Sequence, residues 1–117
     1  MNERGWNKTL LTQSKLITPP DNIIMKLKSI NKKEIIVIFK NESKKTWLYG
    51  ESYSLNVNLD GKWYDIPAVQ PIIFTKIGYL LEVNSSAEKE YSIEAYGDLP
   101  SGKYRIVVDG LYAEFDI

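Results

Sequence analysis

Residues 99–117 read LPSGKYRIVVDGLYAEFDI. The first six residues have the spacing Leu-x-x-Gly-x-Tyr, which is the form of a tyrosine corner built from Leu99, Gly102 and Tyr104. In such a corner the tyrosine hydroxyl bonds to a backbone group a few residues upstream and fixes the loop that crosses between two packed sheets. We expect the glycine to supply a tight turn and the leucine to fill the space beneath it. The spacing therefore predicts a structural role for Tyr104 rather than a catalytic one.

The remainder of this stretch alternates apolar and polar residues on either side of Asp109-Gly110. Residues 103–108 and 111–117 each place their apolar side chains on one face, as strands do when one side is buried. A two-residue Asp-Gly link between such runs predicts a hairpin, because both of its positions need positive φ. The same arrangement occurs upstream, where residues 53–59 alternate and Asp60-Gly61 follows at once.

Further β patterns fill most of the chain. A β-branched run without alternation is typical of a strand in the middle of a sheet, and residues 34–40 form one. Shorter strand candidates are residues 23–29, 72–74, 79–83 and 89–95, with an edge strand at 15–18. Seven or eight short strands without a sustained helical period predict an all-β antiparallel sandwich. We expect residues 1–22, which contain Pro19-Pro20, to form an extended arm, and residues 23–117 to form one domain.

Four segments of the chain resemble a known family. They are residues 36–43, 49–67, 96–107 and 113–117, of which the third, YGDLPSGKYRIV, is the most specific. Together they resemble the bacterial immunoglobulin-like domains at the C-terminal end of small secreted proteins and lipoproteins of Gram-positive bacteria. The resemblance implies an immunoglobulin-like antiparallel β-sandwich of about seven or eight strands, located outside the cytoplasm. The chain departs from the family in its short link at residues 109–110 and in lacking a lipid-acceptor cysteine.

The composition excludes several classes of protein. The 117 residues include no cysteine and no histidine, so the chain has no disulfide, thiolate nucleophile or imidazole base. Fifteen Lys and Arg balance fifteen Asp and Glu, and the isoelectric point of about 6.3 argues against a nucleic-acid partner. The longest apolar run, residues 35–39, is too short to span a membrane. Residues 1–22 lack the apolar core of a signal peptide.

The carboxylates mark neither a catalytic pair nor a metal site. Glu88, Glu90, Glu94 and Asp98 are close in sequence, and alternation places Glu90 and Glu94 on a solvated face. A glycosidase pair would need one carboxyl group in an apolar pocket, and no sequence feature selects such a pair. The aspartates at turns do not form a calcium-binding loop. We therefore predict no enzymatic activity, no metal and no cofactor.

Aromatic residues provide the candidate binding site. Trp47, Tyr49, Trp63 and Tyr64 lie within eighteen residues and flank one predicted hairpin. Neighbours on a strand face opposite ways, so one of Trp63 and Tyr64 should point outward and the other into the core. Trp47 follows a polar loop, where we expect it to be partly exposed. Trp6, in the arm, either packs back on the domain or contacts a partner. For each of these residues the competing interpretation is core packing.

Two functions stay open at this point. The first is a non-catalytic module outside the cytoplasm that contacts a protein or a cell-wall component. The second is a carbohydrate-binding module that uses exposed aromatic rings. An exposed apolar sheet edge would favour the first, and a planar row of exposed rings would favour the second. A concave pocket holding two carboxyl groups with raised pKa values would instead favour an enzyme.

Overall fold

The computed structural model describes residues 6–74 and 76–117, which form nine strands and two short 3-10 helices. In chain order the elements are η1 (Lys8–Leu10), β1 (Ile23–Ile30), β2 (Glu34–Asn41), β3 (Trp47–Gly50), β4 (Ser54–Leu59), β5 (Lys62–Asp65), β6 (Gly78–Leu81), β7 (Ser86–Ser92), η2 (Glu94–Tyr96), β8 (Lys103–Val108) and β9 (Leu111–Asp116). The prediction of an all-β antiparallel sandwich is confirmed, with more strands than the seven or eight expected.

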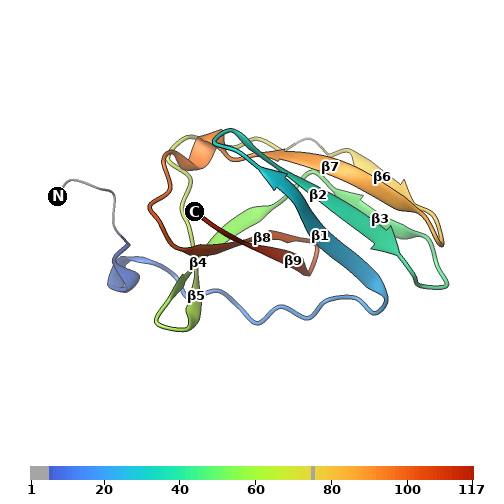
Figure 1. Cartoon of the computed structure of the whole chain (residues 1–117), viewed down its shortest axis with the longest axis horizontal. Helices are drawn as coiled ribbons and strands as arrows, with labels where there is room; N and C mark the ends of the chain where they lie inside the picture. Colours follow the sequence, from blue (N-terminus) through green and yellow to red (C-terminus); the bar gives the residue numbers. More distant parts are fainter. Residues whose placement is uncertain (1–5, 75) are drawn as a thin grey trace.

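The strands form two facing layers (Figure 1). One layer contains the sheet β1-β2-β7, with the two-stranded ribbon β3-β6 on the same side of the molecule. The other layer is the sheet β5-β4-β8-β9, and every paired strand in both layers is antiparallel. β3 and β4 are consecutive in the chain but pair with different sheets. Residues 51–53 therefore carry the chain from one layer to the other.

The core lies between the layers and is made of alternate residues from the facing strands. Ile35, Val37 and Phe39 of the central strand β2 have no exposed surface, and neither do Ile106 and Val108 of β8. Each such side chain contributes roughly 1.5–3 kcal/mol when it is fully removed from water. The position of β2 in the middle of its sheet is the one that its unbroken apolar run predicted.

Both predicted Asp-Gly hairpins are confirmed. Asp60 and Gly61 have φ angles of 55° and 84° and join β4 to β5. Asp109 and Gly110 have φ angles of 48° and 84° and join β8 to β9. Positive φ at both positions matches the twist of the flanking strands, which is why two residues suffice for each turn.

Two predicted strands are wrong and two are displaced. Residues 72–74 lie in the loop between β5 and β6, where Pro71 offers no amide for a ladder. Residues 15–18 form no strand either. The strand expected at 79–83 is β6, which ends earlier, and the strand expected at 89–95 is β7, which ends before the turn of η2.

Residues 6–22 are the described part of the arm. They pair with the sheet closer to the start of the chain than the edge strand expected at residues 15–18. Gln13 forms an isolated antiparallel bridge with Tyr64 of β5. The amide of Ser14 donates to the carbonyl oxygen of Trp63 at 2.9 Å, and the amide of Asp65 donates to that of Thr12 at 2.8 Å. The arm thus covers the outer edge of β5 and then runs along the lower side of the molecule to β1 (Figure 1). Residues 1–5 of the expected arm lie outside the described residues.

Candidate functional site

Trp47 and Tyr49 pack between the layers instead of forming an exposed patch. They lie two residues apart on β3, so they face the same way and their rings stack at 5.0 Å. Phe39 contacts both rings, at 5.3 Å and 4.8 Å between centroids, and Tyr79 stacks on Tyr49 at 5.2 Å. Tyr49 is buried and Trp47 half-buried. Trp47 is therefore partly exposed as expected, but it lies on a strand and packs against core rings.

Trp63 and Tyr64 lie on β5, in the opposite layer from Trp47 and Tyr49. Both are half-buried, and their rings face opposite ways as expected, with Tyr64 toward the core and Trp63 on the outer side of the sheet. Tyr64 packs against the core and is bridged by the arm, whereas the guanidinium of Arg105 lies 4.5 Å from the centre of the Trp63 ring. The four aromatic residues predicted as one site therefore belong to two separate places.

Trp6 packs back onto the domain beside Tyr104. Its indole Nε1 donates to the hydroxyl of Tyr104 at 2.9 Å, and the two rings meet edge to face at 6.5 Å. The same hydroxyl donates to the carbonyl oxygen of Pro100 at 2.5 Å, four residues upstream. Tyr104 thus makes the type of bond that defines a tyrosine corner. Trp6 of the arm contributes to the surroundings of that corner.

Leu99 and Gly102 occupy the same corner, although the glycine has a different role from the one expected. Leu99 is half-buried against the core. Gly102 is absent from the residues with positive φ, so the turn does not use its conformational freedom. Its amide and carbonyl instead exchange hydrogen bonds with Ile117 at 3.1 Å and 3.0 Å, which extends the pairing of β8 with β9.

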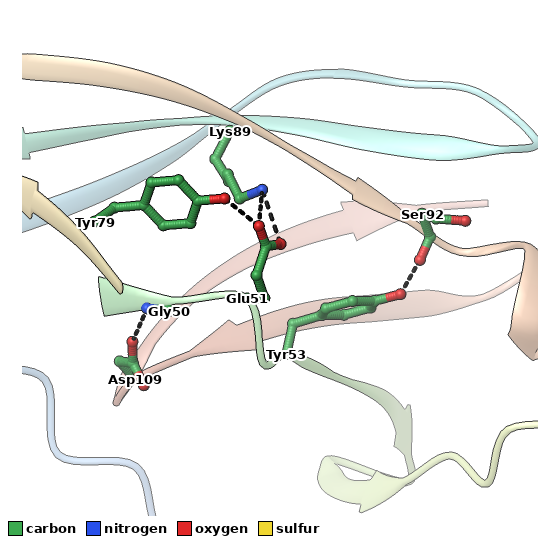
Figure 2. Close-up of polar contacts among 7 residues, drawn as sticks. All are labelled: Gly50, Glu51, Tyr53, Tyr79, Lys89, Ser92 and Asp109. Atoms are coloured by element: carbon green, nitrogen blue, oxygen red, sulfur yellow. Dashed lines mark hydrogen bonds and ion pairs between the residues drawn. The ribbon is translucent and has the colours of Figure 1, made fainter. Parts of the chain in front are cut away.

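A polar network joins the layers where the chain crosses between β3 and β4 (Figure 2). The carboxylate of Glu51 lies 2.9 Å from Nζ of Lys89 on β7 and also accepts a hydrogen bond from the hydroxyl of Tyr79 on β6. These donors, Tyr79 first and Lys89 second, lower the pKa of Glu51. Burial would lower the pKa of Lys89, but its contacts with Glu51 outweigh burial and raise it. The pair is therefore charged at neutral pH and serves to hold the crossing in place.

Two further contacts flank this network. Asp109, at the tip of the β8–β9 hairpin, accepts a hydrogen bond from the amide of Gly50 at 3.1 Å (Figure 2). The hydroxyl of Tyr53 donates to the carbonyl oxygen of Ser92 at the end of β7. Burial, with a smaller contribution from Tyr96, raises the pKa of Tyr53 to about 12, so its hydroxyl keeps its proton. These side chains bind backbone groups and thus stabilise the fold.

A cleft of about 710 Å³ brings several carboxyl groups together beside Tyr53 and Phe74. Glu34, Glu90 and Glu94 line it, and a hydrogen bond with Glu34, together with its charge, raises the pKa of Glu90. Glu90 is nevertheless exposed on the outer side of β7. A general acid of the glycosidase type needs an apolar pocket. Ile72, Phe74 and Ile77 also line this cleft, but Glu90 and Glu94 are exposed, which is unlike the enclosed setting of a general acid.

Arg105 is a candidate binding residue that the sequence did not reveal. Only 7% of it is exposed, and its guanidinium lies between the rings of Trp63, at 4.5 Å, and Tyr112, at 5.3 Å. Its Nε donates to Oδ1 of Asn56 at 2.8 Å. The signal was present in the register of the last hairpin. Arg105 pairs with Glu114, and Tyr112 lies two residues from Glu114 on the same face of β9.

The ribbon β3-β6 carries an apolar outer face. Leu48 and Leu80 are cross-strand partners, and 62% and 69% of their surfaces are exposed. Leu48 extends over Gly78, where an added Cβ would lie 3.0 Å from its Cδ1. Ile77, next in the chain, is also exposed. Adjacent exposed apolar side chains of this kind are typical of a surface that contacts another molecule.

Comparison with known proteins identifies the family. The family model described as a bacterial Ig-like domain matches residues 21–116. The chain belongs to the bacterial Ig-like domain family. Members of this family are generally non-enzymatic and are commonly extracellular or surface-associated. Neither the curated proteins nor the solved structures contained a match to this Ig-like chain.

In residues 6–74 and 76–117, no group of three or more Asp or Glu side chains is placed to hold a metal ion. Within the same residues, no helix has the length and apolar character that crossing a membrane would require. The β3-β6 ribbon and the region around Arg105 are two candidate binding surfaces among the described residues.

Proposed function

We propose that this bacterial Ig-like domain is a non-catalytic module that acts outside the cytoplasm by contact with a protein or another cell-envelope component. The observation that carries the proposal is the exposed pair Leu48 and Leu80, in register on the outer face of the β3-β6 ribbon. Burying apolar surface of this kind against a partner contributes about 25 cal/mol for each Å² removed from water. Location outside the cytoplasm is supported by the family.

The polar side chains support the non-catalytic part of the proposal. Glu51, Lys89 and Tyr79 bind one another at the strand crossing, and Asp109 binds a backbone amide. Groups held in this way position strands and are not placed to act on a substrate. Glu90, the carboxyl group of the cleft whose pKa is raised, is exposed rather than enclosed in an apolar pocket as a general acid would be.

The proposal can be tested with single substitutions of matched chemistry. Leu80→Glu and Leu48→Glu each place a charge on the ribbon, while Leu10→Glu does the same at a residue that is 82% exposed on η1. Circular dichroism establishes that each variant is folded, and retention on envelope preparations of the source cells measures binding. We expect both ribbon variants to lose retention and Leu10→Glu to keep it. Equal retention of all four proteins would refute a role for the ribbon, and cell fractionation tests the location.

Carbohydrate binding is the second candidate, and one observation favours it. Trp63 is half-buried and Tyr112 is 40% exposed on the outer face of the four-stranded sheet, where a sugar ring could contact them. Trp47 no longer supports this function, since its ring is stacked on Tyr49. A glycan array tests the candidate directly, with Trp63→Ala as the variant that should lose any signal.

A further inference from the structure

A groove of about 380 Å³ lies between the arm and the outer face of the four-stranded sheet. Arg105, Trp63 and Tyr112 line the sheet side, and residues 13–17 of the arm line the other. Its volume is within the range of small-ligand sites, which are roughly 300–1,000 Å³. All of its lining residues belong to the described part of the chain.

Arg105 is a buried charge without an ionic partner. Among the described residues, no carboxylate lies within salt-bridge distance of its guanidinium, and its side-chain hydrogen bond to the protein runs from Nε to Asn56. Nearly buried charges are normally paired, because removing an ion from water costs several kcal/mol. The remaining nitrogens of a guanidinium form a planar fork that matches a carboxylate or phosphate group.

The nearest acidic groups do not fill this role. Asp65 accepts hydrogen bonds from the hydroxyl of Ser14 at 2.7 Å and the amide of Asn56 at 3.0 Å. Glu114 forms an ion pair with Lys103 at 3.2 Å. Both carboxylates interact electrostatically with Arg105, but neither lies within salt-bridge distance of its guanidinium.

The groove itself is positively charged. Its lining residues include Lys15, from the arm, and Lys62, from the tip of the β4–β5 hairpin, but no aspartate or glutamate. Both lysines are exposed, so they can turn toward a ligand. A groove with three cations and no anion among its lining residues attracts negatively charged ligands.

We infer that this groove binds an acidic saccharide, with the carboxylate or phosphate group of the sugar on Arg105 and its ring against Trp63 and Tyr112. Lys15 and Lys62 lie at the rim and add to the attraction. Gln13 and Ser14 of the arm provide amide and hydroxyl groups for the sugar hydroxyls. The inference deepens the second candidate function by naming the class of sugar, and it is independent of the β3-β6 ribbon.

An acidic peptide fits the groove less well than a sugar. Peptides commonly bind β-proteins by adding a strand to an open sheet edge. The edge of β5 beside the groove is already occupied, since Ser14 and Thr12 of the arm bond to the backbone of Trp63 and Asp65. A sugar that carries an acid group and hydroxyl groups does not need an open sheet edge in order to bind.

The test is an NMR titration of the ¹⁵N-labelled protein with D-glucuronate, D-glucose, inorganic phosphate and a tetraglutamate peptide. We expect glucuronate to shift the indole resonance of Trp63 and the amides of the groove, and to bind more tightly than the other three. Increasing salt should weaken binding because part of the attraction is screened. Arg105→Gln should weaken binding about 10-fold or more, as expected for loss of a charge-assisted bidentate contact.

Because Arg105 is buried, replacing it can also unfold the protein. A second variant, changed only at exposed residues, therefore tests the groove without that effect. The double variant Lys15→Gln, Lys62→Gln changes exposed residues and should weaken glucuronate binding several-fold. Lys44→Gln, Lys45→Gln removes the same charge from the exposed β2–β3 turn and should bind like the wild type. Absence of glucuronate binding, equal effects of the two double variants, or tighter binding of phosphate or the peptide would each overturn the inference. Equal binding of glucose would also overturn it, while leaving a neutral-sugar module possible and the ribbon untouched.

Discussion

Replacing Tyr104 with phenylalanine removes a hydroxyl that links Pro100 and Trp6 by hydrogen bonds. The hydroxyl donates to the carbonyl oxygen of Pro100 at 2.5 Å and accepts from the indole of Trp6 at 2.9 Å. The phenylalanine ring can keep the stacking on Phe115, whose centroid lies 5.7 Å away. The substitution therefore tests the hydrogen bonds with little change in packing.

The expected cost follows from the surroundings of the two partners. A net hydrogen bond within a protein contributes about 0.5–1.5 kcal/mol, and an unsatisfied buried partner costs about 1–3 kcal/mol. Pro100 and Trp6 are both half-buried, so water can replace part of each lost bond. We expect Tyr104→Phe to lower the free energy of unfolding by about 1–2 kcal/mol.

Urea denaturation followed by far-UV circular dichroism measures this change without relying on the tryptophan signal. Trp6→Phe removes the indole group that donates to this hydroxyl, and the double variant closes a thermodynamic cycle. We expect a coupling between Trp6 and Tyr104 of about 0.5–1 kcal/mol. A loss below about 0.3 kcal/mol for Tyr104→Phe would show that the corner does not stabilise the fold. A coupling of zero would show that the arm does not depend on the hydroxyl.

Three further predictions concern charge and backbone. Glu51→Gln should cost about 1–2 kcal/mol at pH 7, since it leaves Lys89 without its counter-charge in a site that water partly screens. Because the pKa of Glu51 is lowered on folding, urea denaturation should show this difference complete above pH 4.5 and lost as the pH falls through the lowered value. Glu90→Gln should stabilise the fold at pH 7, where Glu90 is ionised against a like charge. Its pKa is raised on folding, so the gain should disappear as the pH falls toward 4.5, and a gain that persists in acid would contradict this reasoning. Gly110→Ala should cost more than Gly61→Ala in thermal unfolding, although both have a φ of 84°. Only at Gly110 would the new Cβ lie close to the arm, 3.3 Å from the carbonyl oxygen of Thr18. Equal losses of stability in the two variants would show that the arm moves away from the new methyl group without a penalty.

The features of the fold that could be predicted from the sequence are those set by residues close together in the chain. A two-residue turn needs positive φ at both positions, so Asp60-Gly61 and Asp109-Gly110 mark hairpins without any knowledge of the rest of the chain. Alternation along β8 and β9 likewise follows from the geometry of a single strand. The spacing of Leu99, Gly102 and Tyr104 placed a hydroxyl within reach of Pro100.

The candidate site could be predicted only in part, because exposure depends on distant partners. Partial exposure of Trp47 was expected after a polar loop, but its packing against Phe39 from β2 was not. Arg105 follows the corner tyrosine directly, and alternation placed it on the outer face. Its burial comes from Trp63 and Tyr112, which are brought to it by two hairpins and covered by the arm. The register of the last hairpin indicates that Tyr112 lies near Arg105, but no local pattern indicates Trp63 or the arm beside it.

Two basic side chains, one half-buried and one buried, show how this fold separates structure from binding. Lys89 is held at the strand crossing by Glu51, so its charge is balanced within the protein and ties β7 to the crossing segment.

Arg105 is less accessible than Lys89, yet its charge is met by an amide oxygen and two aromatic rings. A hydrophobic residue at this position would avoid the cost of desolvating the charge. Departures from the rule that buried charges are paired occur chiefly at functional sites. The unbalanced charge, open to a groove with two more cations, is therefore the strongest reason to look for an anionic ligand there.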